Sequence, residues 1–143
     1  MYSGELTVVS FFNGPELDKI AWYGGNSSQG YKGRGWSTDQ WKDKQYPGGA
    51  AGPRQKGQKQ ANAWGIYDIL GNVNEWCLDW KADYPEGFVS DPAGPKEGLV
   101  RVKRGGSWTD GASNSRAASR GQLKANARLN HTGFRIVLCP TGP

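Results

Sequence analysis

Residues Gly65 to Trp76, GIYDILGNVNEW, place oxygen-bearing side chains where a strand or a helix would carry apolar ones. Two acids and two asparagines interrupt an otherwise apolar run that also contains two glycines. Carboxylate, amide and main-chain carbonyl oxygens are the ligands of hard cations, and a glycine-containing turn lets carbonyls point inward. The alternative is a turn without an ion, in which Asp68 caps a backbone N–H and Glu75 pairs with an arginine. The stretch therefore predicts a cation site or a hydrogen-bonded structural turn.

Short strands and long loops must position these residues. The segments NEWCLDW (74–80), VRVKRGGSW (100–108), TGFRIVLC (132–139) and ELTVVSFF (5–12) are short, apolar or aromatic, and bounded by glycine or polar residues, which predicts strands. PELDKIAWY (15–23) predicts one or two helical turns that begin at Pro15. Residues 24–61 and 81–99 lack a sustained period and are rich in glycine and proline, which predicts two long surface loops. Trp36 and Trp41 are expected to anchor the first loop.

Composition favours one folded, loop-rich domain over residues 1–143. The chain has 22 glycines, 8 prolines and 7 tryptophans, and 36% of its residues are hydrophobic. So much glycine and proline argues against long helices and for a core built around large aromatic side chains. Disordered chains are poor in aromatic residues, whereas here these make up 12% of the sequence.

Charge and hydropathy narrow the classes of partner. The net charge is +5, but the basic residues are spread along the chain without a dense run, so we expect no nucleic-acid partner. No apolar stretch approaches the ~20 residues of a membrane span, and the N-terminus lacks the features of a signal peptide. We therefore expect a soluble protein, cytoplasmic by default. Cys77 and Cys139 are expected to be buried thiols, with a disulfide between them as the alternative.

Three motifs follow one another in the chain: NAWGIYDILGNVNEWCLDW, then RVKRGGSW, then RAASR followed by TGFRIVLC. In this order and spacing the chain resembles, from about Asn62 to Cys139, the formylglycine-generating enzyme (sulfatase-modifying factor) family, a branch of the C-type lectin-like fold. The resemblance implies an α+β domain with small antiparallel sheets and one or two short helices. It also implies a structural calcium ion, whose ligands would be Asp68, the carbonyls of Gly71 and Val73, and Glu75. Asn74 departs from the family pattern, in which a tryptophan is commonest.

The same resemblance argues against catalysis. Active members bind copper through two cysteines just after GGSW, because only a soft ligand such as a thiolate holds Cu(I). In this chain Asp110 and Ser115 occupy those positions. His131 is the single histidine, which excludes the histidine set of related iron oxidases, and no serine has a nucleophile-elbow pattern around it. We therefore expect no copper, with oxidation of a cysteine in a protein substrate as the alternative function.

The C-terminal third also resembles the variable proteins of diversity-generating retroelements, which present a mutable ligand-binding surface on the same fold. Small polar residues cluster there between apolar and arginine positions. This pattern predicts a non-catalytic module that binds a protein or a small molecule, and an ordinary solvated loop is the alternative. The candidate ligand-binding residues are Trp108, Thr109, Asp110, Gly111, Ser113, Asn114, Ser119, Gly121, Leu129, Asn130 and His131.

Several large side chains have two interpretations. Four arginines are expected to serve the scaffold by pairing with Asp68, Glu75 or Asp79 and by donating to loop carbonyls: Arg104, Arg116, Arg120 and Arg135. As ligand contacts they would suit carboxylates or phosphates. Trp108 is predicted to be a ligand platform or a buried anchor. Exposed aromatic residues on the first long loop, Trp36, Trp41 and Tyr46, would suit a protein partner.

Overall fold

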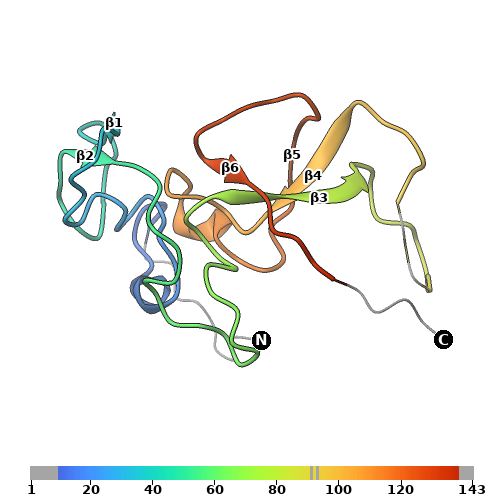
Figure 1. Cartoon of the computed structure of the whole chain (residues 1–143), viewed down its shortest axis with the longest axis horizontal. Helices are drawn as coiled ribbons and strands as arrows, with labels where there is room; N and C mark the ends of the chain where they lie inside the picture. The colour runs from blue at the N-terminus through green and yellow to red at the C-terminus, as the bar shows by residue number, and fades with distance from the viewer. Residues whose placement is uncertain (1–9, 91, 93, 139–143) are drawn as a thin grey trace.

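The computed structural model describes residues 10–90, 92 and 94–138. Most of the strand predicted over 5–12 lies outside these residues, as does Cys139. Two short 3-10 helices and six strands are assigned within the described residues (Figure 1). In chain order they are η1 (Pro15–Lys19), β1 (Trp36–Ser37), β2 (Ala50–Ala51), β3 (Asn74–Trp80), β4 (Val100–Arg104), η2 (Ala112–Asn114), β5 (Gly121–Lys124) and β6 (Thr132–Gly133).

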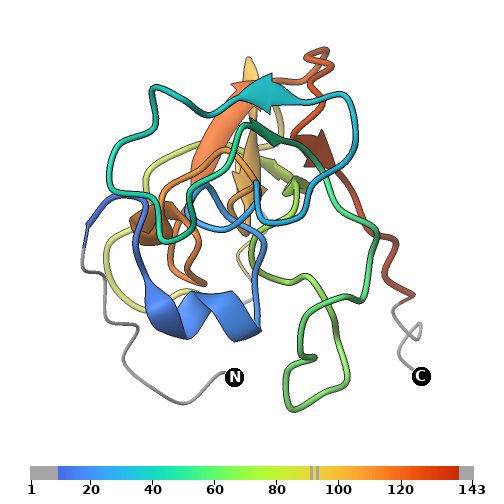
Figure 2. The same cartoon turned by 90° about the vertical axis from the view of Figure 1, so that its left-hand side faces the viewer.

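The helical turn predicted over 15–23 is present as η1, with Pro15 in its first turn. Proline suits that position because its missing N–H would have no helical partner. The helix buries Leu17, which packs with a small core beside the sheet. Figure 2 shows η1 in blue in the lower part of the molecule, beneath the loops of the same end. The core consists of Leu17, Ile20, Ala21, Tyr23, Leu70 and Ala112.

The first long loop is not wholly on the surface, contrary to the prediction. Asn26 and Ser27 are fully buried, and Ser28 is nearly so. The Asn26 amide accepts a hydrogen bond from the Tyr23 N–H at 2.9 Å and donates to the Ala21 carbonyl and to Asp18 Oδ1, each at 2.9 Å. A buried polar side chain is tolerated when its hydrogen bonds are made, so this amide serves as part of the core. Sequence polarity alone gave no sign of this.

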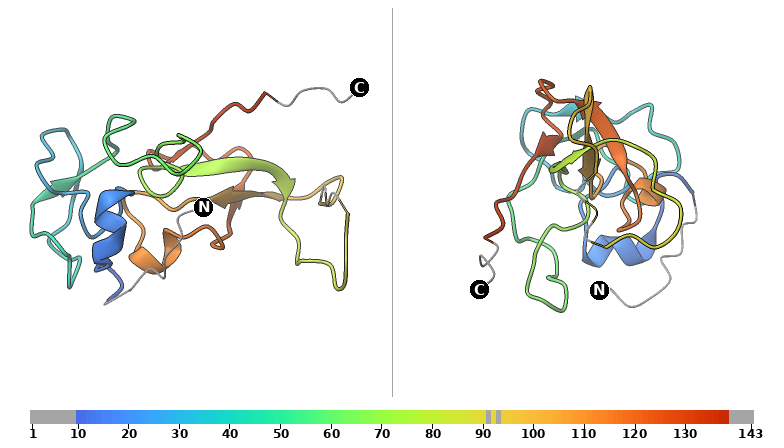
Figure 3. Two further views of the ribbon diagram at one scale, coloured as in Figure 1. Left: turned by 90° about the horizontal axis from the view of Figure 1, so that it is seen from below. Right: turned by 90° about the vertical axis from the view of Figure 1, so that its right-hand side faces the viewer.

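The sheet that carries the site has the strand order β5-β4-β3-β6. Strand β3 has the bounds expected from the sequence, and its antiparallel pairing with β4 contains an irregularity between Trp76 and Trp80. Strand β5 was missed by the sequence analysis and pairs antiparallel with β4 from Gly121 to Lys124. The left-hand view of Figure 3 shows the sheet and the loop beyond it extending away from the core.

Two strand predictions were too long. Strand β4 ends at Arg104, because Gly105 and Gly106 both have positive φ (90° and 75°) and turn the chain out of the sheet. Strand β6 contains only Thr132 and Gly133, and it pairs with β3 in parallel, not antiparallel as expected. Residues 134–138 continue without regular structure.

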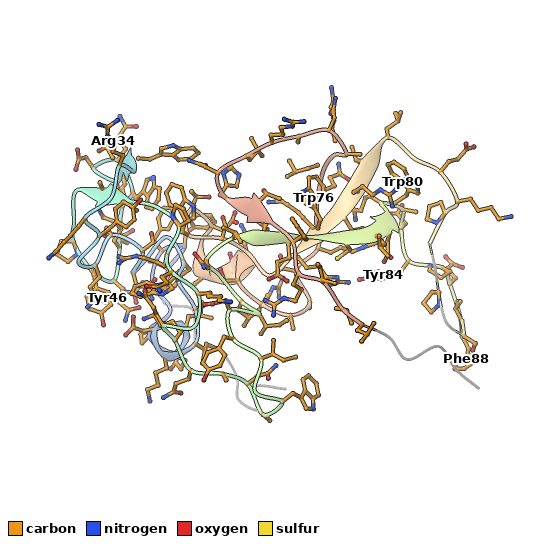
Figure 4. The ribbon with its side chains drawn as sticks, in the orientation of Figure 1. Arg34, Tyr46, Trp76, Trp80, Tyr84 and Phe88 are labelled. Carbon is orange, nitrogen blue, oxygen red and sulfur yellow. The ribbon has the colours of Figure 1, made fainter. Side chains whose placement is uncertain are left out.

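The second long loop is confirmed as an exposed excursion. It begins after β3, and the Lys81 N–H closes it by donating to the Val100 carbonyl at 2.9 Å. Phe88, on this loop, is 98% exposed. Figure 4 shows Phe88 far from Arg34 and Tyr46, which lie at the opposite end of the molecule, whereas Tyr84 lies close to the sheet. The loop therefore returns to the sheet at its base and projects at its tip.

Candidate ligand-binding site

Four of the predicted ligand-binding residues line one polar cavity of about 200 Å³. Its walls come from the start of β3, the end of β4, helix η2 and the residues that lead into β5. Sequence analysis predicted Asp110, Asn114, Ser119 and Gly121 for this role. The structure adds Asn74, Lys103, Arg104, Gly106 and Arg120. The cavity is therefore assembled from segments far apart in the chain.

Asp110 is held in the cavity wall by hydrogen bonds. Its Oδ2 accepts from the Asn74 amide at 2.8 Å and from the Ser107 hydroxyl at 2.6 Å. Asn74 is 3% exposed and Ser107 is fully buried, so this carboxylate satisfies two buried donors. Asp110 thus joins β3 to the segment after β4. The sequence signal for Asn74 was its departure from the tryptophan that is commonest there in the family, and this departure did not indicate a binding site.

Arg104 and Arg120 donate to loop carbonyls, as the scaffold interpretation predicts, but neither forms an ion pair with Asp68, Glu75 or Asp79. Arg104 donates to the Ala117 carbonyl at 3.1 Å and to the Tyr84 hydroxyl at 3.1 Å. Arg120 donates to the Ala82 carbonyl at 2.6 Å, and its guanidinium lies 4.6 Å from the centre of the Tyr84 ring. Both arginines thereby attach the base of the loop 81–99 to the sheet. Tyr84, which contacts both, was not singled out in the sequence.

Trp108 is a buried anchor, and the ligand-platform interpretation is wrong. Its side chain is fully buried, and its ring centre lies 5.1 Å from that of Trp36 in an edge-to-face arrangement. Trp36 itself is 48% exposed and keeps the place predicted for it on the surface. Gly111 is also buried, and a side chain at this position would meet the Phe11 carbonyl.

The remaining predicted residues do not line the cavity. Thr109 is half-buried and its hydroxyl hydrogen-bonds that of Ser107 at 3.0 Å. Ser113 is half-buried, and Leu129 is 40% exposed. The Asn130 carbonyl accepts a hydrogen bond from the Trp108 ring at 3.4 Å, and Asn130 is exposed. These positions belong to the surface around the site.

His131 lies beside Trp36, with 5.8 Å between the ring centres. Burial lowers the pKa of His131 below its usual range, and the nearby Lys103 lowers it further, while Asp110 opposes the shift. The imidazole is therefore neutral at pH 7. The backbone carbonyl of His131 accepts a hydrogen bond from the Asn74 N–H at 2.9 Å, directly before β6 begins at Thr132.

The turn 65–76 contains the hydrogen bonds that the ion-free alternative predicts. Asp68 Oδ2 accepts from the Gly57 N–H at 2.7 Å. Arg135 Nε donates to Glu75 Oε2 at 2.6 Å and its Nη2 donates to Glu75 Oε1 at 2.5 Å. Gly71, with φ of 76°, brings its Cα against the Trp22 backbone, where a side chain would lie 2.4 Å from the Trp22 carbonyl. The turn is therefore a junction between β3, the loop 54–57 and the core.

The donor set still fits a hard cation in one respect. Asp68 Oδ1 is buried and makes no hydrogen bond, and Asp68, Val73 and Glu75 line a common cavity. Each carboxylate oxygen of Glu75 retains an unused lone pair beside its bond to Arg135. No group of three His, Cys, Asp or Glu side chains gathers within the described residues, so an ion here would depend on main-chain carbonyls. The calcium ion stays a prediction.

Cys77 is a free, half-buried thiol on β3. Burial raises its pKa, while Arg104 and Arg120 act in the opposite direction. Its thiolate is consequently scarce at neutral pH. No helix of the described residues is long and apolar enough to cross a membrane.

Comparisons with known proteins agree with this architecture. The model of the sulfatase-modifying factor enzyme 1-like domain matches residues 11–139. The chaperone protein LppX of Paenibacillus barcinonensis is 31% identical over 84% of this chain and 38% of its own length. The formylglycine-generating enzyme of Thermomonospora curvata is 39% identical over 55% of this chain and 29% of its own. The chain thus spans less than two fifths of the length of these relatives.

A solved structure shows the same fold. Treponema denticola variable protein 1 superposes with a TM-score of 0.65 at 34% sequence identity, over 84% of this chain and 36% of that protein. Both resemblances noted in the sequence, to formylglycine-generating enzymes and to variable proteins, are thereby confirmed. The two short helices, small sheets and long loops of this chain are those of a C-type lectin-like α+β fold. The chain belongs to the family of sulfatase-modifying factor enzyme 1-like domains.

Proposed function

We propose that the chain is a non-catalytic module that binds a protein or small-molecule ligand in the polar cavity between β3, η2 and β5. The observation that supports this most directly is convergence. Asp110, Asn114, Ser119 and Gly121 are spread over twelve positions, and they line one cavity together with Asn74 from a distant strand. Polar groups converging on a concave surface are typical of ligand sites.

The scaffold suits display of variable side chains. Asn114 is exposed and Ser119 half-buried, and neither side chain makes a hydrogen bond within the described residues. Asp110, Asn74 and Ser107, in contrast, form a bonded wall. Side chains at positions 114 and 119 can therefore change without loss of the wall, as a variable protein requires.

The test is a selection for ligands followed by a cavity-filling variant. Peptides selected from a displayed random library on the immobilised domain should bind at least about tenfold more weakly when Asn114→Tyr and Ser119→Trp fill the cavity, a change of ~1.4 kcal/mol. Arg34→Gln, on an exposed residue at the other end of the molecule, is the matched control. Equal binding to both forms, with unchanged melting temperatures, would place the ligand elsewhere.

The alternative function is oxidation of a cysteine to formylglycine, which the similarity to formylglycine-generating enzymes supports. It would need a metal-binding group where Asp110 and Ser115 stand, and Ser115 is fully buried with its hydroxyl 3.4 Å from the Gly111 carbonyl. Incubation with copper, oxygen and a cysteine peptide separates the two functions. Mass spectrometry should show the peptide unchanged, and conversion to the aldehyde would establish the enzyme.

We also propose a structural calcium ion at Asp68, Glu75 and the carbonyls of Gly71 and Val73. The unpartnered Oδ1 of Asp68 supports it, and hard oxygen ligands of this kind favour calcium. Calcium should raise the melting temperature of the wild-type chain relative to chelator, and Asp68→Ala should abolish the rise. A rise in melting temperature that persists in Asp68→Ala would show that calcium does not bind at this turn.

A further inference from the structure

The polar cavity has an excess of positive charge. Lys103, Arg104 and Arg120 line it, and Asp110 is the only acid among the described residues of its lining. The ion pairs of the described residues are Lys59 with Asp18 and Arg135 with Glu75, so none of the three cavity cations has a carboxylate of these residues within 4.0 Å. Cations that line the same concave site attract anionic ligands.

Asp110 offsets only part of this charge, because it is one acid against three cations. Its Oδ2 accepts hydrogen bonds from Asn74 and Ser107, at 2.8 Å and 2.6 Å, so this oxygen is engaged by the wall. Arg104 is also largely used by the protein, since its Nη1 donates to the Ala117 and Ser119 carbonyls and its Nη2 to the Tyr84 hydroxyl. Arg104 therefore contributes charge more than hydrogen bonds.

Arg120 keeps a binding edge. It donates through Nη1 to the Ala82 carbonyl at 2.6 Å, and the Tyr84 ring supports the face of its guanidinium. Its Nε and Nη2 make no hydrogen bond to the described residues. These two nitrogens present parallel N–H donors, the edge that binds both oxygens of a carboxylate.

We propose that the ligand of the polar cavity carries a carboxylate group, which Arg120 binds through two hydrogen bonds while Lys103 and Arg104 supply further positive charge. This inference rests on the proposed function, since it names the chemistry of a ligand at the same site. The carboxylate can belong to an acidic side chain of a protein or to a free dicarboxylic acid.

An adjoining cavity gives the rest of a peptide a place to lie. Arg104 and Arg120 also line a second cavity of about 280 Å³ beneath the loop 81–99, together with Tyr84, Pro85 and Val89. Asp79 and Asp83 lie in its walls, so this second cavity disfavours another anion. A peptide in which an acidic residue adjoins an apolar one therefore matches the two cavities.

The test is an NMR titration of the ¹⁵N-labelled chain with four probes: glutarate, inorganic phosphate, and the peptides acetyl-Ala-Glu-Leu-Ala-amide and acetyl-Ala-Gln-Leu-Ala-amide. We expect saturable shifts of the Asn114 and Gly121 amides with glutarate and the glutamate peptide, and at least about tenfold weaker binding of the glutamine peptide. Tighter binding of the glutamate peptide than of glutarate, with shifts at Gly87 and Gly94, identifies a protein as the source. Equal binding of the two identifies a free acid.

Two variants and a control complete the experiment. Arg120→Gln should remove the preference for glutamate over glutamine, and Lys103→Gln, on the same cavity, should weaken it if the first variant does not fold. Arg116→Gln, at an exposed arginine that lines neither cavity, should bind as the wild type does.

The proposal is overturned if the two peptides bind equally, if phosphate binds more tightly than both carboxylates, or if neither carboxylate binds. If the two peptides bind the cavity equally, the carboxylate proposal fails while the proposed binding site stands. If the selected ligands bind the cavity-filled variant as tightly as the wild type, the proposed site itself fails.

Discussion

Removal of Arg135 tests whether an ion pair, and not an ion alone, stabilises the turn 65–76. Arg135 contacts both carboxylate oxygens of Glu75 and donates to the Tyr67 and Asp68 carbonyls, each at 3.2 Å. The pKa of Arg135 is raised, chiefly by its hydrogen bond to Glu75, so its guanidinium stays charged. Arg135→Gln keeps some length but loses the charge and the fork.

The magnitude follows from burial. The side chains of Arg135 and Glu75 are 32% and 21% exposed. An exposed pair is worth ~0–1 kcal/mol, and breaking a fully buried one costs ~3–5 kcal/mol. At intermediate burial, with two carbonyl bonds also lost, we expect Arg135→Gln to lower the free energy of unfolding by about 2–3 kcal/mol.

Urea unfolding followed by tryptophan fluorescence measures this loss. With a urea dependence of ~1.5–2 kcal/mol per M, the midpoint should fall by about 1–2 M. Glu75→Gln in the Arg135→Gln background should add little, because the interaction is already broken. Arg116→Gln, at an exposed position, is the control and should stay within ~0.5 kcal/mol. A loss below ~0.5 kcal/mol in Arg135→Gln would refute the reasoning.

Three further predictions concern the site and the turn. Asp110→Ala should lower the free energy of unfolding by ~1–3 kcal/mol, because two buried donors lose their acceptor; Asn114→Ala should change it by less than ~0.5 kcal/mol, and similar losses in thermal melts would contradict the bonded wall. Gly71→Ala should cost more than Gly30→Ala, although both have positive φ, because only Gly71 lies against backbone; equal unfolding midpoints would disprove this. Stability should fall as pH drops below ~6.5, the ordinary histidine pKa, because the unfolded chain then binds a proton at His131 that the folded chain, with its lowered pKa, does not bind. His131→Gln should therefore reduce the change in melting temperature between pH 7.5 and pH 5.

Local pattern was sufficient where neighbouring residues decide the conformation. Pro15 at a first-turn position predicted the helical turn, and the short apolar and aromatic run NEWCLDW predicted β3 from Asn74 to Trp80. The glycines after Arg104 end β4, whereas the predicted strand ran on to Trp108, a residue type that favours strands. Positive φ at these glycines prevailed over that propensity.

The sequence by itself determined the family, the fold and the order of the motifs, because these depend on residue types at fixed spacing. The tertiary structure alone decided the partners of the polar groups. It placed Trp108 in the core, set Asn74 against Asp110, and brought Arg120 beside Tyr84. The Asn74–Asp110 contact joins residues 36 positions apart, and Trp108 packs against Trp36 from a more distant loop, so no local pattern encodes these contacts. Burial and hydrogen bonding across the chain fixed which polar residues became wall and which line the cavity, since an unpaired buried group is costly.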